Sequence, residues 1–302
     1  MTIIPPYLKK GDTIGIVCPA GYMPFEKAQT CIETLSSWGF KVVPGKTLGN
    51  QYHYFSGTDK ERCKDLQHML DDENIDAILC GRGGYGTGRI IDQLDFSKFK
   101  KHPKWIIGFS DITILHCHLF SNFKIASMHA PMAAAFNDGE FQNQYIQSLR
   151  NTLLGEKSDY KTEGNILDQP GKAKGILVGG NLSLLVNVIG TSSDIKTKNK
   201  ILFIEEVGEY IYSVDRMMYQ LKRSGKLDHL SGLIIGRFSD MKDTTVPFGQ
   251  TIEQSIKDLV RNYHYPVCFR FPVSHEKENY ALKVGVKYKL NIQKNLVELK
   301  EI

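Results

Sequence analysis

Short apolar runs alternate with amphipathic stretches through the first half of the 302-residue chain. The apolar runs have the length of buried strands, and the stretches between them carry apolar residues at helical spacing. Strands are predicted at 13–18, 41–43, 77–80 and 105–108, and helices at 25–38, 59–72, 88–94 and 111–120. This alternation is typical of βαβ units, so residues 1–165 are predicted to form an N-terminal α/β domain with a parallel sheet.

The second half of the chain has a more mixed pattern. A polar, glycine-containing stretch at 155–174 is typical of a domain junction. Beyond it, strands are predicted at 201–204 and 232–235, helices at 214–221 and 251–262, and a hairpin from 288–292 and 296–299. Residues 166–302 are therefore predicted to form a smaller C-terminal domain of mixed α/β structure.

Composition narrows the class of protein. The chain is 41% hydrophobic and 24% charged, which excludes a mainly disordered protein. Its net charge of +5 is spread out, which argues against a nucleic-acid partner. No apolar run approaches the ~18 residues of a membrane span, and the first residues lack the apolar core of a secretory signal. The six cysteines form no C-x-x-C pair, as expected for reduced thiols, so a cytoplasmic protein is predicted.

A serine stands where an apolar strand is predicted to meet a helix, in the tetrapeptide GFSD at 108–111. Such a turn exposes the hydroxyl of Ser110 at the end of a sheet and places the backbone N–H of Asp111 at a helix start, where it can stabilise an oxyanion. The G-x-S-x-G pattern of nucleophile turns is incomplete, because Ile112 replaces the last glycine. A plain helix cap is the alternative role for Ser110.

A second feature is the glycine-rich segment CGRGGYGTG at 80–88, which follows a predicted strand. It contains G-x-G-x-x-G and so formally matches a dinucleotide fingerprint. It lies after the third strand rather than the first, and no acidic strand end follows about 20 residues later, both of which weaken that interpretation. Closely spaced glycines also present bare backbone N–H groups to an anion or a developing oxyanion.

Candidate partners for a nucleophilic serine lie in the second half of the chain. Glu205, Glu206 and Glu209 follow an apolar strand, where one of them could orient a histidine, although the sequence does not select among them. His275, in a polar loop, is a candidate general base or an ordinary surface residue. Ser110, a glutamate and His275 follow the chain order Ser, acid, His, which one class of triad hydrolases shares.

A metal site is the less favoured interpretation of the histidines. His116 and His118 flank Cys117 on a predicted helix, and His129 follows. Residues two apart on a helix point to different faces, and no H-E-x-x-H or paired-cysteine spacing supports a zinc site. We expect neither a metal nor an organic cofactor.

Taken together, these segments resemble the LD-carboxypeptidase family of serine peptidases, which also contains the microcin C self-immunity peptidases. The resemblance extends over nearly the whole chain, and several spaced motifs in one order carry it. They are GDTIGIV at 11–17, CGRGGYG at 80–86, IIGFSDIT at 106–113, GGNLS at 179–183, LFIEEVGE at 202–209 with Tyr212, Asp215 and Arg216, and 274–285. The resemblance implies an N-terminal parallel-sheet domain, flavodoxin-like or glutamine-amidotransferase-like, that carries the nucleophile, and a C-terminal domain that supplies acid and histidine.

The resemblance also implies a Ser-His-Glu triad, no cofactor and a homodimer. Matched by motif, Ser110 is the nucleophile, Glu205 the acid and His275 the base. The backbone N–H groups of Gly84 and Asp111 match the oxyanion hole. This gives the glycine-rich segment a role in catalysis rather than in dinucleotide binding.

The implied substrate is a small peptide, a cytoplasmic muropeptide from which terminal D-alanine is released during peptidoglycan recycling. A carboxypeptidase must hold the terminal carboxylate, and Arg82, Gly83 and Arg237 are candidates, although a structural ion pair is open for either arginine. Many relatives have Gly before the histidine and Leu-Pro later in that loop. Here these are Ser274 and Leu282-Lys283, which leaves substrate details open.

Two other functions stay open at this point. An immunity-type peptidase would cleave peptidyl-nucleotide conjugates with the same residues. A non-catalytic protein would use the same two domains to bind an anionic ligand.

Overall fold

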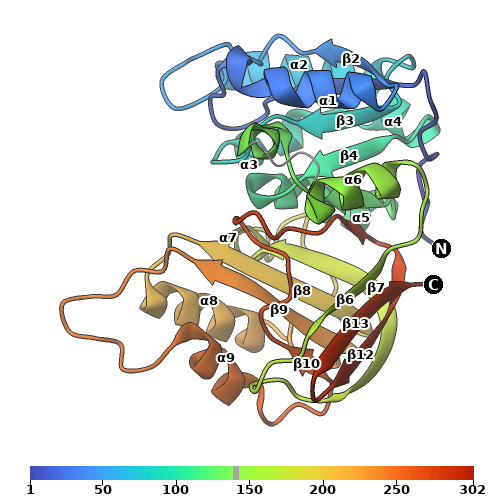
Figure 1. Cartoon of the computed structure of the whole chain (residues 1–302). Coiled ribbons are helices and arrows are strands. Elements are labelled where there is room, and N and C mark those ends of the chain that lie inside the picture. The colour runs from blue at the N-terminus through green and yellow to red at the C-terminus, as the bar shows by residue number, and fades with distance from the viewer. Residues whose placement is uncertain (139–142) are drawn as a thin grey trace. The chain divides into compact units, whose positions relative to one another are not determined.

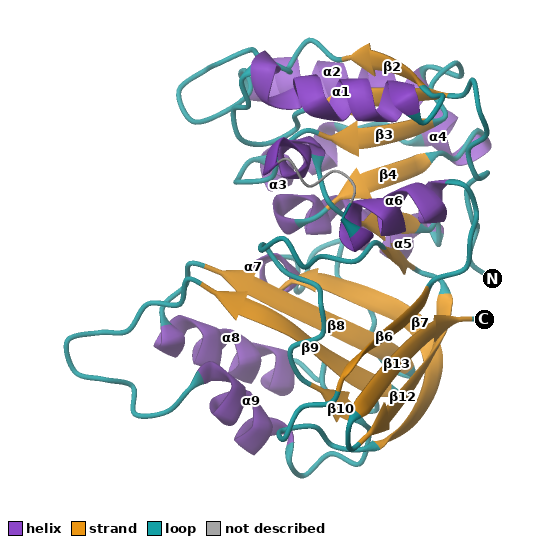
Figure 2. Ribbon diagram, viewed as in Figure 1, coloured by secondary structure: helices purple, strands orange, loops and turns teal. Residues whose placement is uncertain are grey.

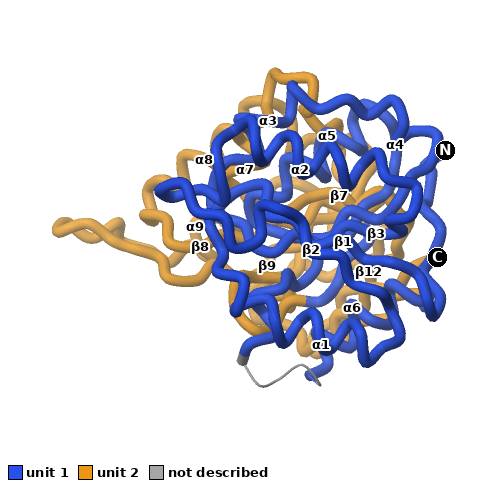
Figure 3. Tube along the Cα trace, turned by 90° about the horizontal axis from the view of Figure 1, so that it is seen from above, with its two compact units in different colours: residues 1–156, 280–283 blue, residues 157–279, 284–302 orange. Residues whose placement is uncertain are grey.

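The computed structural model describes residues 1–138 and 143–302 and divides the chain into two compact units. Unit 1 comprises residues 1–156 and 280–283, and unit 2 comprises residues 157–279 and 284–302 (Figure 3). Both are built of strands and helices, which confirms the predicted α/β class. In the described part of the chain, every helix is too short or too polar to span a membrane.

Unit 1 is built on a six-stranded sheet in the order β11-β5-β4-β3-β1-β2 (Figure 2). The strands are β1 (Thr13–Val17), β2 (Lys41–Pro44), β3 (Ala77–Cys80), β4 (Trp105–Gly108), β5 (Ser127–His129) and β11 (Leu282–Val284). The pairs among β1 to β5 are all parallel. Strands β3 and β4 are buried along their whole length, as expected where helices cover both faces of a parallel sheet.

Helices lie on both faces of this sheet: α1 and α6 on one face, and α2, α4 and α5 on the other (Figures 1 and 3). The helical segments are η1 (Phe25–Ala28), α1 (Gln29–Ser37), α2 (Asp59–Asp71), α3 (Thr87–Ile90), η2 (Ile91–Gln93), α4 (Ser97–Lys101), η3 (Ser110–Ile112), α5 (Thr113–Phe123), η4 (Ala133–Asp138) and α6 (Gln144–Leu153). Helix α2 begins with a capping box, in which Thr58 and Glu61 satisfy each other's backbone N–H groups.

Unit 2 contains a seven-stranded mixed sheet in the order β10-β9-β8-β7-β12-β13-β6. The four strands from β10 to β7 are parallel, and the rest pair antiparallel. Its elements are β6 (Asp159–Glu163), β7 (Gly171–Asn181), α7 (Leu182–Asn187), β8 (Lys200–Val207), α8 (Ile211–Arg223), β9 (Gly232–Ser239), α9 (Ile252–Val260), β10 (Val267–Cys268), β12 (Lys287–Gln293) and β13 (Leu296–Glu301). The predicted C-terminal hairpin is the antiparallel pair β12–β13.

The polar stretch at 155–174, predicted as a domain junction, includes the point where the chain passes from unit 1 to unit 2. It contains β6 and the first part of β7, and the chain leaves unit 1 at residue 156 rather than 165. Lys172 and Lys174 are exposed, while Gly171 and Ala173 are half-buried. The strand therefore alternates between a solvated and a covered face, and its polar half resembles a loop in sequence.

Candidate active site

Ser110 stands at a sharp turn between β4 and η3. Its backbone has φ = +62°, in the left-handed region, while the preceding Phe109 is extended. Non-glycine residues rarely adopt this conformation, and such strain is often found at functional sites. Among the described residues, no side-chain hydrogen bond caps η3 or α5, so Ser110 does not serve as the helix cap. The turn has the form that presents a nucleophile at the end of a sheet.

The glycine-rich segment approaches this serine so closely that a side chain would not fit. A Cβ atom at Gly83 would lie 2.8 Å from Ser110 Cβ and 2.9 Å from Ser110 Oγ, closer than real Cβ contacts. The next residue, Gly84, has φ = +101°, which also favours glycine. The position of the serine therefore requires glycine at 83, and the backbone conformation favours glycine at 84.

Two backbone N–H groups are candidate donors to an oxyanion. One belongs to Asp111, the residue after Ser110, and the other to Gly84, the residue after Gly83. Within the described residues, the N–H groups of Gly84 and Asp111 donate no hydrogen bond to the protein. Asp111 is buried, and buried backbone donors are normally paired, so its unpaired N–H beside a strained serine suits an anion or a developing oxyanion. Gly84 is exposed, so its N–H is open to solvent or to a ligand.

His116 supports the strand that leads to the serine. Its Nε2 lies 2.8 Å from the Gly108 carbonyl oxygen and its Nδ1 lies 2.8 Å from the Ser127 hydroxyl. Because a carbonyl only accepts, Nε2 donates to Gly108 and Nδ1 accepts from Ser127. Burial lowers the pKa of His116 to about 4, which keeps the ring neutral. Among the described residues, no three His, Cys, Asp or Glu side chains gather where they could hold a metal ion.

In unit 2, Glu205 and His275 form a close pair. Glu205 Oε2 lies 2.6 Å from His275 Nδ1. The glutamate side chain is fully buried near the end of β8, and the histidine side chain is 16% exposed. A carboxylate only accepts, so Nδ1 carries the proton, and the neutral ring has its lone pair at Nε2. A histidine in this tautomer can act as a general base through Nε2.

Opposing effects set the pKa of His275. Burial lowers it, but the charge and hydrogen bond of Glu205, together with the charge of Glu206, outweigh burial. The pKa is therefore raised above its ordinary value of 6.5. The buried carboxylate stabilises the charged ring, which is the state that a general base reaches after it accepts a proton.

Glu206 has a different set of partners. Its carboxylate accepts bonds from Asn181 Nδ2 at 2.8 Å, from Ser183 N at 2.8 Å and from Ser183 Oγ at 2.6 Å. Burial is the main cause that raises the pKa of Glu206. Neighbouring residues in a strand point to opposite faces, so Glu206 holds the start of α7 while Glu205 meets the histidine.

The two arginines considered for substrate binding differ in their surroundings. Arg82, which is exposed, donates from Nη1 to the Tyr22 carbonyl at 2.8 Å. Arg237 forms ion pairs with Glu276, at 3.2 Å, and with Glu278. Two carboxylates therefore already neutralise Arg237, and they belong to the loop that carries the histidine. This arrangement favours a structural role for Arg237 and leaves Arg82 as the better candidate for a substrate carboxylate.

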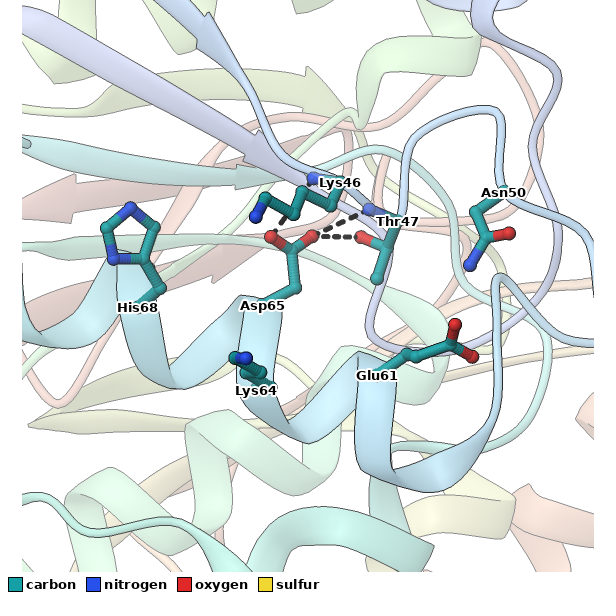
Figure 4. Close-up of a pocket in the computed structure, with 7 residues that line it drawn as sticks. All are labelled: Lys46, Thr47, Asn50, Glu61, Lys64, Asp65 and His68. Carbon is teal, nitrogen blue, oxygen red and sulfur yellow. Dashed lines mark hydrogen bonds between the residues drawn. The ribbon is translucent and has the colours of Figure 1, made fainter.

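The predicted residues are thus distributed over both units. Ser110, Asp111 and the segment 82–84 belong to unit 1, whereas Glu205, His275 and Arg237 belong to unit 2. A separate pocket in unit 1 contains none of them. It is lined by Lys46, Thr47, Asn50, Glu61, Lys64, Asp65 and His68 (Figure 4).

Sequence reasoning missed the residues that support the glycine-rich segment. Arg62 and the side chain of Asp111 contact it directly, and His116 holds the strand before the serine. Asp111, which adjoins Ser110, was considered for its backbone N–H alone, and His116 was considered only as a metal ligand. Nothing in the sequence distinguishes Arg62 from a solvent-exposed helical arginine.

Comparisons with known proteins agree with the fold and these motifs. Profiles of the LD-carboxypeptidase N-terminal and C-terminal domains match residues 14–130 and 174–290. A probable murein peptide carboxypeptidase of Bacillus subtilis is 37% identical over 290 residues, which cover 95% of this chain and 91% of that protein. The chain belongs to the LD-carboxypeptidase family.

Solved structures show the same fold. The muramoyltetrapeptide carboxypeptidase from Oxalobacter formigenes aligns with a TM-score of 0.86 at 28% identity, covering 96% of this chain and 98% of that one. The microcin C7 self-immunity protein MccF, in complex with aspartyl sulfamoyl adenosine, aligns with a TM-score of 0.89 at 23% identity, covering 99% of each chain. At that identity the second likeness shows the fold alone.

Proposed function

We propose that this chain is a cytoplasmic serine carboxypeptidase that releases terminal D-alanine from murein-derived tetrapeptides. The observation that carries the proposal is the strained turn at Ser110, with Gly83 packed against the hydroxyl. The Glu205–His275 pair supports it, because a serine needs a base to become a nucleophile. The murein peptide substrate is supported by the names of the relatives in Bacillus subtilis and Oxalobacter formigenes.

In the proposed mechanism, Ser110, His275 and Glu205 act on one peptide bond. His275 Nε2 takes the hydroxyl proton as Ser110 Oγ attacks the scissile carbonyl carbon. The N–H groups of Gly84 and Asp111 stabilise the oxyanion. His275 then gives its proton to the departing D-alanine nitrogen, and the C–N bond breaks to leave an acyl-enzyme. Water, deprotonated by His275, then attacks the ester, the bond between the acyl carbon and Ser110 Oγ breaks, and His275 returns the proton to Oγ.

Glu205 has two tasks in this mechanism. Its bond to Nδ1 fixes the ring in the tautomer that offers Nε2 to the serine. Its charge stabilises the imidazolium that forms during each proton transfer. The glutamate accepts no proton itself.

A tetrapeptide assay tests the substrate proposal, and we expect a strict requirement for a free terminal carboxylate. Amidation of that terminus should lower kcat/KM. The corresponding loss of transition-state stabilisation should be about 1.5–3 kcal/mol, as expected for loss of a charged hydrogen bond. Replacing terminal D-alanine by L-alanine should be at least as harmful. With the carboxylate and carbonyl both held, inversion exchanges the methyl group and the hydrogen and creates a clash.

Release of alanine from the acid, the amide and the L-isomer should be measured side by side. Equal rates for all three would contradict carboxypeptidase action and leave only a serine hydrolase. Cleavage of a peptidyl-nucleotide conjugate in place of the tetrapeptide would identify the immunity-type activity instead.

The pH dependence of kcat/KM should report the raised pKa of His275. The base must be neutral to act, so activity should be lost as pH falls through this pKa. The midpoint of this loss should lie above pH 6.5. Glu205→Gln removes the main cause that raises the pKa, so the residual activity of this variant should persist to lower pH. A midpoint that does not move between wild type and Glu205→Gln would contradict this assignment.

A further inference from the structure

The carboxylate of Asp111 joins the serine turn to the far end of the glycine-rich segment. Asp111 directly follows Ser110 and is 1% exposed. Its Oδ2 accepts a hydrogen bond from the backbone N–H of Thr87 at 2.7 Å. Thr87 is the first residue of α3 and lies near the C-terminal end of the glycine-rich segment. The side chain of one residue therefore fixes the distance between the nucleophile turn and this segment.

A buried arginine holds the same end of the segment from the other side. Arg62, on α2, is fully buried and donates from Nη1 to the Gly86 carbonyl at 2.9 Å. It also donates to the carbonyl of Pro19, and its Nε donates to Gly57 at 3.3 Å. Its charge is paired with Asp59. One guanidinium thus joins three loops of unit 1 that are distant in sequence.

The N-terminal part of the segment has its own attachment. The Gly83 carbonyl accepts a bond from the Gly21 N–H at 3.0 Å. Gly84 lies between this attachment and those at Gly86 and Thr87. Its N–H is consequently held on both sides by contacts within unit 1.

We infer that Asp111 and Arg62 are positioning residues, whose side chains set the place of the Gly84 N–H relative to Ser110. The inference rests on the proposed function, in which that N–H binds the oxyanion. Asp111 contributes through its carboxylate here and through its backbone N–H in the oxyanion hole, so a change of side chain separates the two roles. Loss of the Asp111 carboxylate leaves the N–H groups of Gly84 and Asp111 present, but the Gly84 N–H is no longer held in place from the Thr87 side.

A misplaced oxyanion donor costs transition-state binding and leaves ground-state binding nearly intact. Asp111→Ala should therefore lower kcat by about 10²–10³-fold, the effect of removing one such donor, while KM changes by less than about threefold. Asp111→Asn keeps an acceptor for the Thr87 N–H. We expect it to retain kcat within about tenfold of wild type, a rescue by the conservative residue.

The chain offers a matched control in Asp65. This buried carboxylate, also in unit 1, accepts bonds from Lys46 N at 3.0 Å, Thr47 N at 2.8 Å and Thr47 Oγ1 at 2.6 Å (Figure 4). Among the described hydrogen bonds, it has none with the glycine-rich segment or the serine turn. Asp65→Ala should lower the free energy of unfolding but leave kcat within about threefold of wild type.

The experiment measures kcat, KM and denaturant unfolding for wild type, Asp111→Ala, Asp111→Asn and Asp65→Ala on a tetrapeptide ending in D-alanine. Arg62→Lys is added because it keeps the buried charge but loses the forked geometry, and it should lower kcat with little change in KM. It tests the same attachment if Asp111→Ala does not fold. A similar loss of kcat in Asp111→Ala and Asp65→Ala, or unchanged kcat in both Asp111→Ala and Arg62→Lys, would overturn the inference.

A second readout keeps the inference separate from the substrate. A fluorophosphonate phosphonylates an activated serine, with loss of fluoride, and its reaction depends on the oxyanion donors without any murein peptide. If wild type reacts with this probe but not with the tetrapeptide, the proposed function fails, and the phosphonylation rates of the variants still decide the inference. If wild type reacts with neither, both are overturned.

Discussion

Ser110→Ala should abolish turnover of the D-alanine tetrapeptide while the protein stays folded and still binds it. Loss of a triad nucleophile lowers the turnover number by about 10⁶-fold in a well-studied serine protease. Alanine at this position keeps the left-handed turn at a backbone cost similar to that of serine, since both carry one Cβ atom. We therefore expect the effect to lie in kcat, measured by alanine release, and not in stability.

An exposed helical serine provides the control. Ser36 on α1 is exposed, and its hydroxyl donates to the Ile32 carbonyl of its own helix, so Ser36→Ala should keep the wild-type rate. Isothermal titration of Ser110→Ala with intact tetrapeptide checks that binding survives. If Ser110→Ala retained more than about a tenth of the wild-type rate, the nucleophile would have to be another residue.

Glu205→Gln should have the next largest effect, a loss of about 10³–10⁴-fold in kcat. Replacing the acid of a well-studied triad by its amide costs about 10⁴-fold, because the histidine then adopts the wrong tautomer. Here Glu205 Oε2 bonds to His275 Nδ1, so the amide can equally present an N–H to that nitrogen and force the proton onto Nε2. A ring with its proton on Nε2 cannot accept the serine proton.

Glu206→Gln is the matched control, since it changes the adjacent buried carboxylate in the same way. Glu206 bonds to Asn181 and Ser183 at the start of α7, so its loss should mainly reduce stability, with kcat within about tenfold of wild type. Rates and unfolding curves for both variants should be measured together. A larger loss of kcat in Glu206→Gln than in Glu205→Gln would transfer the role of acid to Glu206.

Local patterns were sufficient for the strands and turn that carry the serine. The predicted strands at 77–80 and 105–108 coincide with β3 and β4. Short, fully apolar runs between polar loops are typical of buried strands. The short strand β5 has a serine and a histidine at its ends and lacks any such run. Its burial depends on β4 and on the His116–Ser127 bond, which no periodicity reveals.

The residues that surround the serine are brought together by contacts between distant parts of the chain, which local sequence patterns do not reveal. The residue pattern alone left three glutamates as possible partners of His275, and the family resemblance pointed to Glu205. The contact itself depends on the position of the strand end relative to the histidine loop, which brings Glu205 to His275. Arg62 was missed because an arginine on an amphipathic helix normally faces water. It is buried here because carbonyls from three separate loops converge on it, and their convergence is a property of the folded chain.

The late position of β11 in the chain affects how unit 1 folds during synthesis. Residues 280–283 complete the sheet of unit 1, where β11 lies beside β5, Ala281 N donates to Ser148 Oγ, and Lys283 Nζ donates to Tyr7 and Glu156. A ribosome must therefore have made the chain as far as residues 280–284 before this sheet can close. Until then the nascent chain presents an open β5 edge, a template for pairing with another chain. A fragment ending at residue 156 should accordingly aggregate, and expressing the two units as separate proteins would divide a sheet rather than a linker.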